Sequence, residues 1–259
     1  MKYTSQSILD AALRQSAVDA SCEKEDFLRS TPVVVDSQTN PGARRYLELP
    51  FDCHLISYGN NVVASVSEEC RELVSAYLRR FPAEHCFETP NLHVLNDALE
   101  EKGLRVCFMA EYFLPDLDWL RPLNCSLPVR ILGPEDFGPL YRPEWSNALC
   151  EKRRELDVLG LGAYDGETLA GFAACSADCG GMWQIGVDVL PAYRRRGIAA
   201  ALTSRLALEI LARGKVPFYC AAWSNVKSVR NAVKSGFRPA WVELTAKPAA
   251  YVEKLNREQ

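Results

Sequence analysis

The chain has 259 residues, a formal net charge of -3 and 48% hydrophobic residues. This length suits one large domain or two small ones, and the apolar fraction supports a packed core, which excludes a disordered chain. The near-neutral charge leaves no electrostatic footprint for nucleic acid. No stretch approaches the roughly 18 apolar residues of a membrane span, and the first residues lack a signal peptide. We therefore expect a soluble cytoplasmic protein with no membrane partner.

The ten cysteines are scattered along the chain and form no CxxC pair. Without a secretion signal, reduced thiols are favoured over a disulfide framework. His85 and Cys86 are adjacent, but neighbours in sequence seldom face each other as a nucleophile and its base. We expect structural cysteines and no metal site.

The first half alternates short apolar strands with amphipathic helices. The elements predicted there, in chain order, are a helix over 7–30, a strand over 33–37, two strands over 53–67, helices over 68–80 and 92–102, and a strand over 105–113. Gly59-Asn60 is a hairpin signal between the two central strands. Three prolines at 115, 122 and 128 then mark a linker. We place the boundary so that residues 1–118 form a small α/β domain and residues 119–259 form a second domain.

The second half has a similar alternation. Its predicted elements are a strand over 129–132, helices over 134–140 and 145–154, strands over 158–164, 168–176 and 182–190, a helix to residue 213, a strand over 216–223, a helix from a Ser224 cap to Gly236, and a strand over 237–245. Asp165-Gly166 predicts a tight turn. The helix ending at residue 213 has an apolar stripe at i+4 spacing, so one face of it is expected in the core.

A basic turn leads directly into this helix, at Arg194–Ala199. The first N–H groups of a helix have no partner inside the helix, and the helix dipole adds a partial positive charge. Gly197 and Ala199 leave room for a phosphate to approach the backbone, and arginine carries forked donors that suit phosphate oxygens. The segment therefore predicts a diphosphate cradle. A solvated basic turn before an ordinary helix is the alternative that these residues leave open.

The same segment fits the pattern (Gln/Arg)-x-x-Gly-x-(Gly/Ala) of GNAT N-acetyltransferases, and the run Val187–Tyr193 precedes it as in that family. Asn225 stands 11 residues before Gly236-Phe237, as the helix-opening Asn of the family stands before its terminal Gly-Phe. Residues 128–247 thus resemble a GNAT domain. The first half resembles the accessory domain of a bacterial branch that includes the zwittermicin A resistance acetyltransferase.

The resemblance implies an α/β fold: a C-terminal mixed, splayed sheet of about six or seven strands with flanking helices, plus a smaller N-terminal α/β domain. It also implies acetyl-CoA as co-substrate. The backbone of Val187 and Val189 would pair with the pantetheine arm, and an N–H near Val189 or Leu190 would stabilise the oxyanion. The full set of implied acetyl-CoA-binding residues is Val187, Val189, Arg194, Arg195, Arg196, Gly197, Ile198, Ala199, Ala200, Asn225 and Ser228.

Two departures from the family concern proton transfer. Ala232 stands where the family often has a Tyr that protonates the leaving thiolate, and the strand start at Met182–Gln184 lacks the usual carboxylate. An alkyl amine has a pKa of about 10 and must lose a proton before it attacks. The substitute candidates are Asp188, Glu144, Ser224, Tyr219 and Cys220. All three histidines (His54, His85, His93) lie in the first half, so a histidine base would require that half to cover the site.

The expected activity is transfer of an acetyl group from acetyl-CoA to the amine of a small molecule, by direct attack without a covalent enzyme intermediate. A non-catalytic acyl-CoA-binding or regulatory module is the alternative, which Ala232 favours. Acetylation of a protein amine would use the same chemistry with another acceptor. The sequence leaves a homodimer open.

Overall fold

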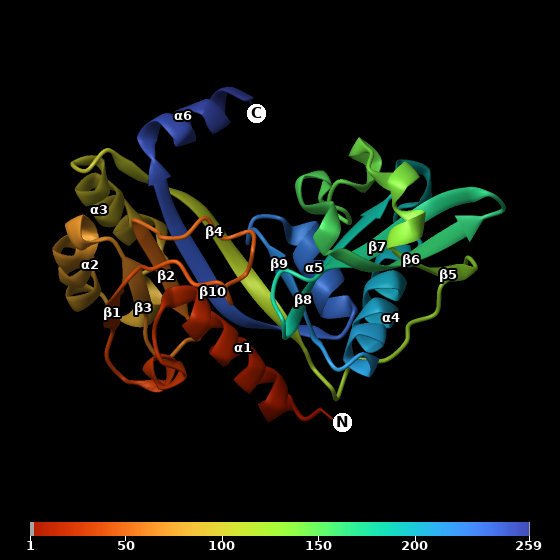
Figure 1. Cartoon of the computed structure of the whole chain (residues 1–259), viewed down its shortest axis with the longest axis horizontal. Helices are drawn as coiled ribbons and strands as arrows, with labels where there is room; N and C mark the ends of the chain where they lie inside the picture. Colours follow the sequence, from red (N-terminus) through yellow and green to blue (C-terminus); the bar gives the residue numbers. More distant parts are fainter. Residues whose placement is uncertain (1–2, 259) are drawn as a thin grey trace. The chain divides into compact units, whose positions relative to one another are not determined.

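The computed structural model describes residues 3–258 (Figure 1). The strands of these residues form one mixed ten-stranded sheet in the order β1-β3-β2-β10-β4-β9-β8-β7-β6-β5. The expected α/β class with a mixed sheet is confirmed, but the sheet has ten strands rather than six or seven. The chain divides into two compact units. The central unit is Met1–Ala11 with Phe113–Pro239, and the terminal unit is Ala12–Tyr112 with Ala240–Gln259.

The terminal unit is built on the predicted hairpin. Strands β2 (Cys53–Ser57) and β3 (Val63–Val66) pair antiparallel, and Gly59 between them has a φ of +98°. Strand β1 (Val33–Asp36) pairs parallel with β3. Helices α2 and α3 lie beside these strands (Figure 1). Their apolar side chains join those of the hairpin in one core. The bounds of the helices and of the first long strand are α1 Ser5–Ala20, α2 Glu68–Arg80, α3 Thr89–Glu100 and β4 Leu104–Pro115.

The central unit is an antiparallel ladder of four strands in chain order, followed by one parallel strand. Strand β9 pairs parallel with β8, and helix α4 packs against the strands from β6 to β9. Its elements are β5 Val129–Leu132, β6 Asp157–Asp165, β7 Thr168–Ser176, β8 Met182–Val189, α4 Ile198–Ala212, β9 Val216–Ala221 and α5 Val226–Lys234. Strand β10 (Phe237–Pro248) begins in this unit and continues into the terminal unit, where it pairs antiparallel with β2. The apolar stripe of α4 is buried, as its spacing predicts.

The predicted helices over 134–140 and 145–154 were wrong. Short 3-10 helices occupy this segment, at Pro134–Asp136, Gly138–Leu140, Pro143–Trp145 and Glu151–Leu156. Prolines open three of them, and a proline lacks the N–H that a continuing helix needs. The segment is therefore held by short runs of i→i+3 hydrogen bonds, such as that from the Trp145 N–H to the Arg142 carbonyl at 3.0 Å, and by side-chain packing.

Several element ends also differ from the prediction. Helix α1 stops at Ala20, because Ser21 adopts a left-handed φ of 60°, and a 3-10 helix follows over Lys24–Leu28. The cap of α5 is Asn225, not Ser224: the Asn225 side chain accepts a hydrogen bond from the Ser228 N–H. Helix α6 (Ala249–Glu258) was not predicted.

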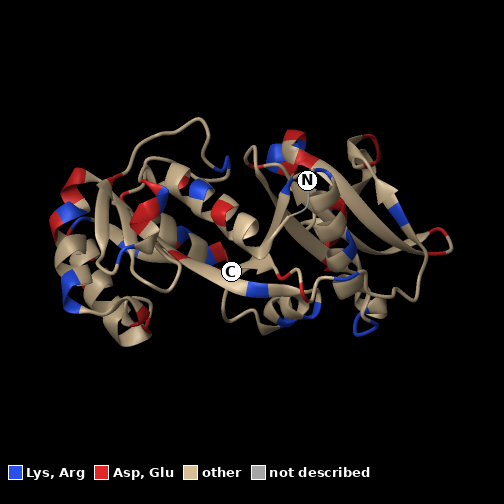
Figure 2. Cartoon of the chain, turned by 90° about the horizontal axis from the view of Figure 1, so that it is seen from below, with Lys and Arg blue, Asp and Glu red and all other residues tan. Residues whose placement is uncertain are grey.

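Acidic and basic residues are interspersed over the helices and loops of both units (Figure 2). Within residues 3–258, no helix is both long and apolar enough to cross a membrane.

A buried cluster of charged side chains lies in the terminal unit. Arg44, whose side chain is only 2% exposed, contacts Asp19 and Glu243 through N–O distances of 2.5 Å each. Glu243 also receives hydrogen bonds from Trp241 at 2.7 Å and faces the His54 ring at 3.3 Å. Burial raises the pKa of the Glu243 carboxyl, but Arg44, His54 and Trp241 outweigh it and hold that pKa well below its usual range. The cluster joins α1, the loop at Arg44 and strand β10.

Replacing Arg44 by Met should destabilise the terminal unit strongly. The two carboxylates would remain buried without their cation, which costs about 3–5 kcal/mol. Urea unfolding of Arg44→Met measures this loss. Arg29→Met is the matched control, because the ion pair of Arg29 with Asp26 has an arginine side chain that is 61% exposed; its removal should cost less than about 1 kcal/mol. Equal losses in the two variants would contradict the expectation.

Candidate active site

Strands β8 and β9 diverge after a short common stretch. Their parallel pairing begins at Met182↔Val216 and ends at Gln184↔Phe218, although both strands continue beyond that point. The remaining part of β8 is thus paired with β7 on one side only. The result is an open backbone edge between two neighbouring strands.

The direction of the β8 backbone groups follows from strand alternation. The Gly181 carbonyl accepts a hydrogen bond from the Val216 N–H at 3.0 Å, so it faces β9. Because successive residues of a strand direct their backbone groups to opposite edges, Val187 and Val189 face the β9 side as well. These are the two residues expected to pair with an extended ligand.

Leu190 was the second expected oxyanion donor, besides Val189. Its N–H donates to the Ala170 carbonyl at 3.0 Å within the sheet. That group is already paired, so the Val189 N–H is the better placed of the two.

The turn before α4 has the geometry of an anion cradle. Arg195 and Gly197 have left-handed φ angles of 65° and 80°, and α4 begins at Ile198. Alternating left-handed residues at a helix start turn successive N–H groups toward one concave side, where they bind anions. A side chain on Gly197 would meet no atom within 4 Å, so the space above it is open. The side chains of Ile198 and Ala200 are buried, so these two residues could contact a ligand only through the backbone.

The three arginines of this turn are exposed, and two of them, Arg194 and Arg196, contact different partners. Arg194 Nε donates to the Val189 carbonyl at 3.0 Å, on the open edge of β8. The Arg196 guanidinium lies 5.2 Å from the centre of the Tyr193 ring. The structure therefore brings Arg194 and Val189 together, two residues that the sequence assigned to different parts of the ligand.

Helix α5 places a pair of hydroxyl groups near its start. The Tyr219 hydroxyl, from β9, and Ser228 Oγ lie 2.7 Å apart. The Tyr219 ring packs between Phe113 and Phe237, and the side chain is only 5% exposed. Burial raises the pKa of Tyr219, and hydrogen bonds with Ser228 and Asn231 offset part of the rise. Tyr219 is thus a protonated phenol at neutral pH.

Ala232 lies one turn after Ser228 on α5, and its side chain is fully buried in the core. A tyrosine would have to fit among packed side chains at this position, which is destabilising. The phenol of this region comes from β9 instead.

Asp188 fixes a loop against β8. Its carboxylate accepts hydrogen bonds from the Asn147 N–H at 2.9 Å, the Asn147 side chain at 2.6 Å and the Ala148 N–H at 3.0 Å. The loop lies so close that a Cβ on Gly186 would overlap the Asn147 carbonyl. Asp188 is therefore occupied in positioning this loop. Asn147 escaped the sequence prediction, because nothing in its neighbourhood signals a contact 41 residues away.

The other candidates are dispersed. Glu144 and Ser224 are exposed, and Cys220 Sγ accepts a hydrogen bond from Gln184 at 3.0 Å. Of the histidines, His54 is buried, whereas His85 and His93 are exposed. Among residues 3–258, no group of three or more His, Cys, Asp or Glu side chains is arranged to hold a metal ion.

The loop over β8 ends at a buried carboxylate. Asp157 is 2% exposed and accepts hydrogen bonds from the Tyr141 hydroxyl at 3.1 Å and the Cys150 N–H at 3.0 Å. Burial raises the pKa of Asp157 to about 6, although both hydrogen bonds act in the opposite direction.

Residues 141–240 match the family model described as GNAT acetyltransferase. The match runs from the loop over β8 to the start of β10 and includes the open edge, the cradle and α5. This segment is therefore similar to the GNAT acetyltransferase family, the family that its motifs resemble. No curated protein matches the chain.

Solved structures with a similar fold are distant. A GNAT-family acetyltransferase from Novosphingobium aromaticivorans is 22% identical, with a TM-score of 0.45, over 56% of this chain and 66% of its own. A GCN5-related N-acetyltransferase from Sphaerobacter thermophilus is 14% identical, with a TM-score of 0.47, over 96% and 95% of the two chains. An acetyltransferase from Salmonella typhimurium, solved with acetyl-CoA, is 17% identical, with a TM-score of 0.34, over 48% and 95%. The match to the first of these spans less than two thirds of that protein.

Asp157 should make stability depend on pH in a defined window. A carboxyl whose pKa rises on folding favours the folded state while protonated, and this contribution is lost as pH rises through the folded pKa. We expect the free energy of unfolding of wild type, minus that of Asp157→Asn, to fall between about pH 4 and pH 7, around the pKa of about 6. Denaturant titrations at several pH values measure the difference. Parallel profiles for the two proteins would count against the role of Asp157.

Proposed function

We propose that the chain transfers an acetyl group from acetyl-CoA to an amine of a small molecule. The observation that carries the proposal is the open edge of β8 beside an anion cradle at the start of α4. The family match over residues 141–240 supports the acetyltransferase chemistry. The choice of a small molecule rests on the resemblance of the first half, residues 1–118, to the accessory domain of the branch that includes the zwittermicin A resistance acetyltransferase.

The residues present fit acetyl-CoA as the co-substrate. The N–H groups from Arg195 to Ala200 would bind the pyrophosphate, and the exposed arginines would add forked donors. The backbone of Val187 and Val189 would pair with the amides of the pantetheine arm, as an added strand does. Arg194 would then release the Val189 carbonyl and become free to meet a phosphate.

The α5 side of the slot would supply polar side chains. Asn225 uses its carbonyl oxygen to cap α5, which leaves its amide N–H groups as donors to the pantetheine. Ser228 is already hydrogen bonded to Tyr219 and can accept or donate further.

The reaction would be a direct displacement. The amine nitrogen forms a bond to the acetyl carbon, the bond from that carbon to sulfur breaks, and the coenzyme leaves as a thiolate. The Val189 N–H would stabilise the oxygen of the acetyl group as it gains charge. The enzyme would contribute mainly by holding the two reactants in attack geometry.

The proton for the thiolate would come from Tyr219. Its phenol is protonated, hydrogen bonded to Ser228 and located on β9, the strand that borders the slot. Tyr219 would thus replace the tyrosine that the family often has at the position of Ala232. The proton of the amine would leave to water, because the Asp188 carboxylate is engaged by the loop.

A non-catalytic acyl-CoA-binding module is the second candidate, because the position of Ala232 lacks the phenol. Such a module would bind acyl-CoA at the same cradle as the enzyme but would not transfer the acyl group. Acetylation of a protein amine remains a variant of the enzyme proposal with another acceptor. A thiol-release assay with acetyl-CoA against small amines, amino sugars and basic peptides separates the three outcomes. Binding of acetyl-CoA without release on any acceptor, up to pH 9, would discard the enzyme proposal.

Replacing Gly197 by Glu should abolish acetyl-CoA binding while the fold survives. The new side chain would enter the open space above the cradle and place a negative charge against the phosphates. We expect the affinity to fall by more than about tenfold, measured by calorimetry. Gly214→Glu is the matched control, because Gly214 follows α4 with a φ of +73° and also has open space around it. Near-normal affinity in folded Gly197→Glu would place the phosphate site elsewhere.

Replacing Tyr219 by Phe should lower turnover by roughly 10²-fold to 10⁴-fold, the usual contribution of a general acid, with acetyl-CoA affinity unchanged. The rate of both proteins should rise with pH, because the amine must deprotonate. Ser228→Ala should show a smaller loss, since the phenol remains. Tyr164→Phe, on β6, is the matched control and should behave like wild type. Steady-state rates with an amine found by the panel give the answer; equal turnover in Tyr219→Phe and wild type would remove Tyr219 from the mechanism.

A further inference from the structure

A cavity of about 320 Å³ lies in the terminal unit. Its lining comes from alternate residues of β4 and β10, from the loop before β2 and from the start of α6, all within that unit. Alternate residues of a strand share one face, so the strand residues form a continuous wall. The volume falls in the usual range for small-molecule sites, about 300–1,000 Å³. The cavity is therefore large enough for a ligand of a dozen or so heavy atoms.

Aromatic side chains are the largest group in the walls. Five rings line the cavity, those of Tyr46, Phe51, Phe108, Tyr112 and Tyr251. Phe108 is 48% exposed and Tyr251 is 39% exposed, and their rings meet edge to face at 6.3 Å. Large apolar side chains that remain open to water beside a cavity are typical of a binding site.

The charged groups of the lining are two carboxylates and one ammonium. Glu243 is buried and is held ionised by Arg44, Trp241 and His54, as described above. Glu48 is 74% exposed and pairs with Lys247 at 2.5 Å. Both carboxylates are thus paired, Glu243 with Arg44 and Glu48 with Lys247, and Glu48 is the one that is open to water.

One ammonium group, that of Lys247, already lies against an aromatic ring and a carboxylate of the cavity. The Lys247 ammonium lies 5.8 Å from the centre of the Phe51 ring while it pairs with Glu48. An ammonium over an aromatic face is attracted by the negative potential of that face. A ligand ammonium would find the same two kinds of partner, rings and a carboxylate.

We propose that this cavity is a binding site for an organic cation, a protonated amine attached to a flat apolar body. The apolar body would lie against Phe108 and Tyr251, and the ammonium would lie toward Glu48 and the wall that contains Glu243. An organic anion of similar shape would instead lie beside the exposed Glu48 carboxylate. The proposal concerns binding in the terminal unit and does not depend on acetyl transfer.

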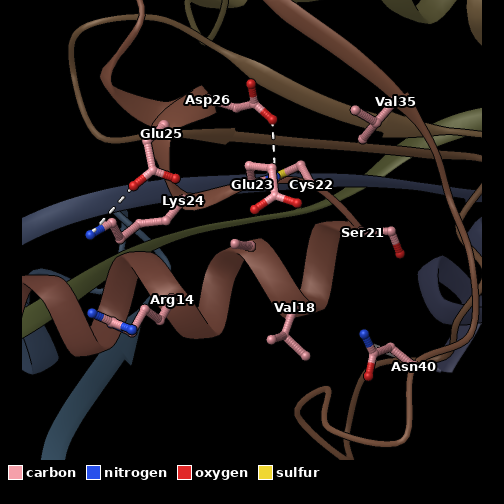
Figure 3. A pocket seen from close by; sticks show the side chains of 11 residues that line it. Arg14, Val18, Ser21, Cys22, Glu23, Lys24, Glu25, Asp26, Val35 and Asn40 are labelled. Carbon is pink, nitrogen blue, oxygen red and sulfur yellow. Dashed lines mark hydrogen bonds and ion pairs between the residues drawn. The ribbon is translucent and has the colours of Figure 1, made fainter.

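A wider cavity of about 850 Å³ lies in the same unit, between α1 and the segment Ser21–Asp26 (Figure 3). Two contacts lie within its lining: Lys24 pairs with Glu25, and the backbone N–H of Glu23 donates to the Asp26 carboxylate. Burial raises the pKa of the Cys22 thiol to about 12, so this thiol is no nucleophile at neutral pH. None of the residues that line this cavity is aromatic, in contrast to the smaller cavity.

Three probes with the same phenylethyl body test the class of ligand: 2-phenylethylammonium, the neutral 2-phenylethanol and the anionic 3-phenylpropionate. Calorimetry on the full-length protein, without acetyl-CoA, should show the cation binding at least roughly fivefold more tightly than either analogue. The Gly197→Glu variant should bind the cation as wild type does. Loss in that variant would mean that the cation occupies the acetyl-transfer site, and would overturn the proposal without touching the proposed function.

Four variants locate the site. Phe108→Ala and Tyr251→Ala change exposed side chains, so the fold should survive, and each should weaken cation binding roughly fivefold. Glu48→Gln should weaken it by a similar factor, whereas Lys247→Met should strengthen it, because the competing ammonium is removed. Leu28→Ala is the control, an equally exposed apolar side chain of this unit outside the cavity. Tighter binding of the anion, with its loss in Lys247→Met, would overturn the proposal, as would unchanged binding of the cation in both aromatic variants.

Discussion

The central unit depends on one constraint, an unpaired backbone edge inside a sheet. Backbone N–H and C=O groups are strong hydrogen-bonding groups that need partners wherever water is excluded. The pairing of β8 with β9 ends at Gln184↔Phe218. Beyond that point the backbone groups on the facing edges of the two strands do not hydrogen bond to each other. The Arg194 side chain satisfies one carbonyl of this edge, that of Val189. The remaining groups suit an extended ligand with amide groups at strand spacing, and the cradle at the start of α4 suits a phosphate.

Much of the fold follows from local signals. Gly59-Asn60 and Asp165-Gly166 each join two antiparallel strands, and the apolar stripe of α4 is buried, because turn chemistry and helical periodicity act over a few residues. The same reasoning gave a wrong prediction for the segment from residue 134 to 156, which forms short 3-10 helices instead of α-helices. Its apolar residues are spaced as in a helix, yet its prolines remove the N–H groups that a helix needs, and the apolar side chains are buried by packing alone. The ten-stranded sheet also could not be predicted, since strand order depends on contacts between distant segments.

The candidate site divides in the same way. The cradle was predictable because its parts, Arg194 to Ala200, are contiguous in sequence and the physics of a helix start is local. The pairing of Tyr219 with Ser228 was not, because it joins β9 to α5 and no pattern in either element requires it. The contact of Asp188 with Asn147 spans a still longer separation. From the sequence, Asp188 is a candidate general base because it lies on the strand next to the cofactor motif. In the structure, its carboxylate oxygens instead accept hydrogen bonds from Asn147 and Ala148 of the loop.

Gly186 shows how such a loop limits the residues that a strand position can accept. Its φ is not among the positive values, so its backbone makes no demand for glycine. The demand comes from the Asn147 carbonyl, which fills the space that any Cβ would need. In a saturation-mutagenesis experiment this position would tolerate almost nothing and would score like a catalytic residue, although it touches no reactant. Intolerance to substitution at Gly186 would here reflect the close contact of the loop with the strand. In a related protein with a side chain at this position, the loop would have to lie farther from the sheet.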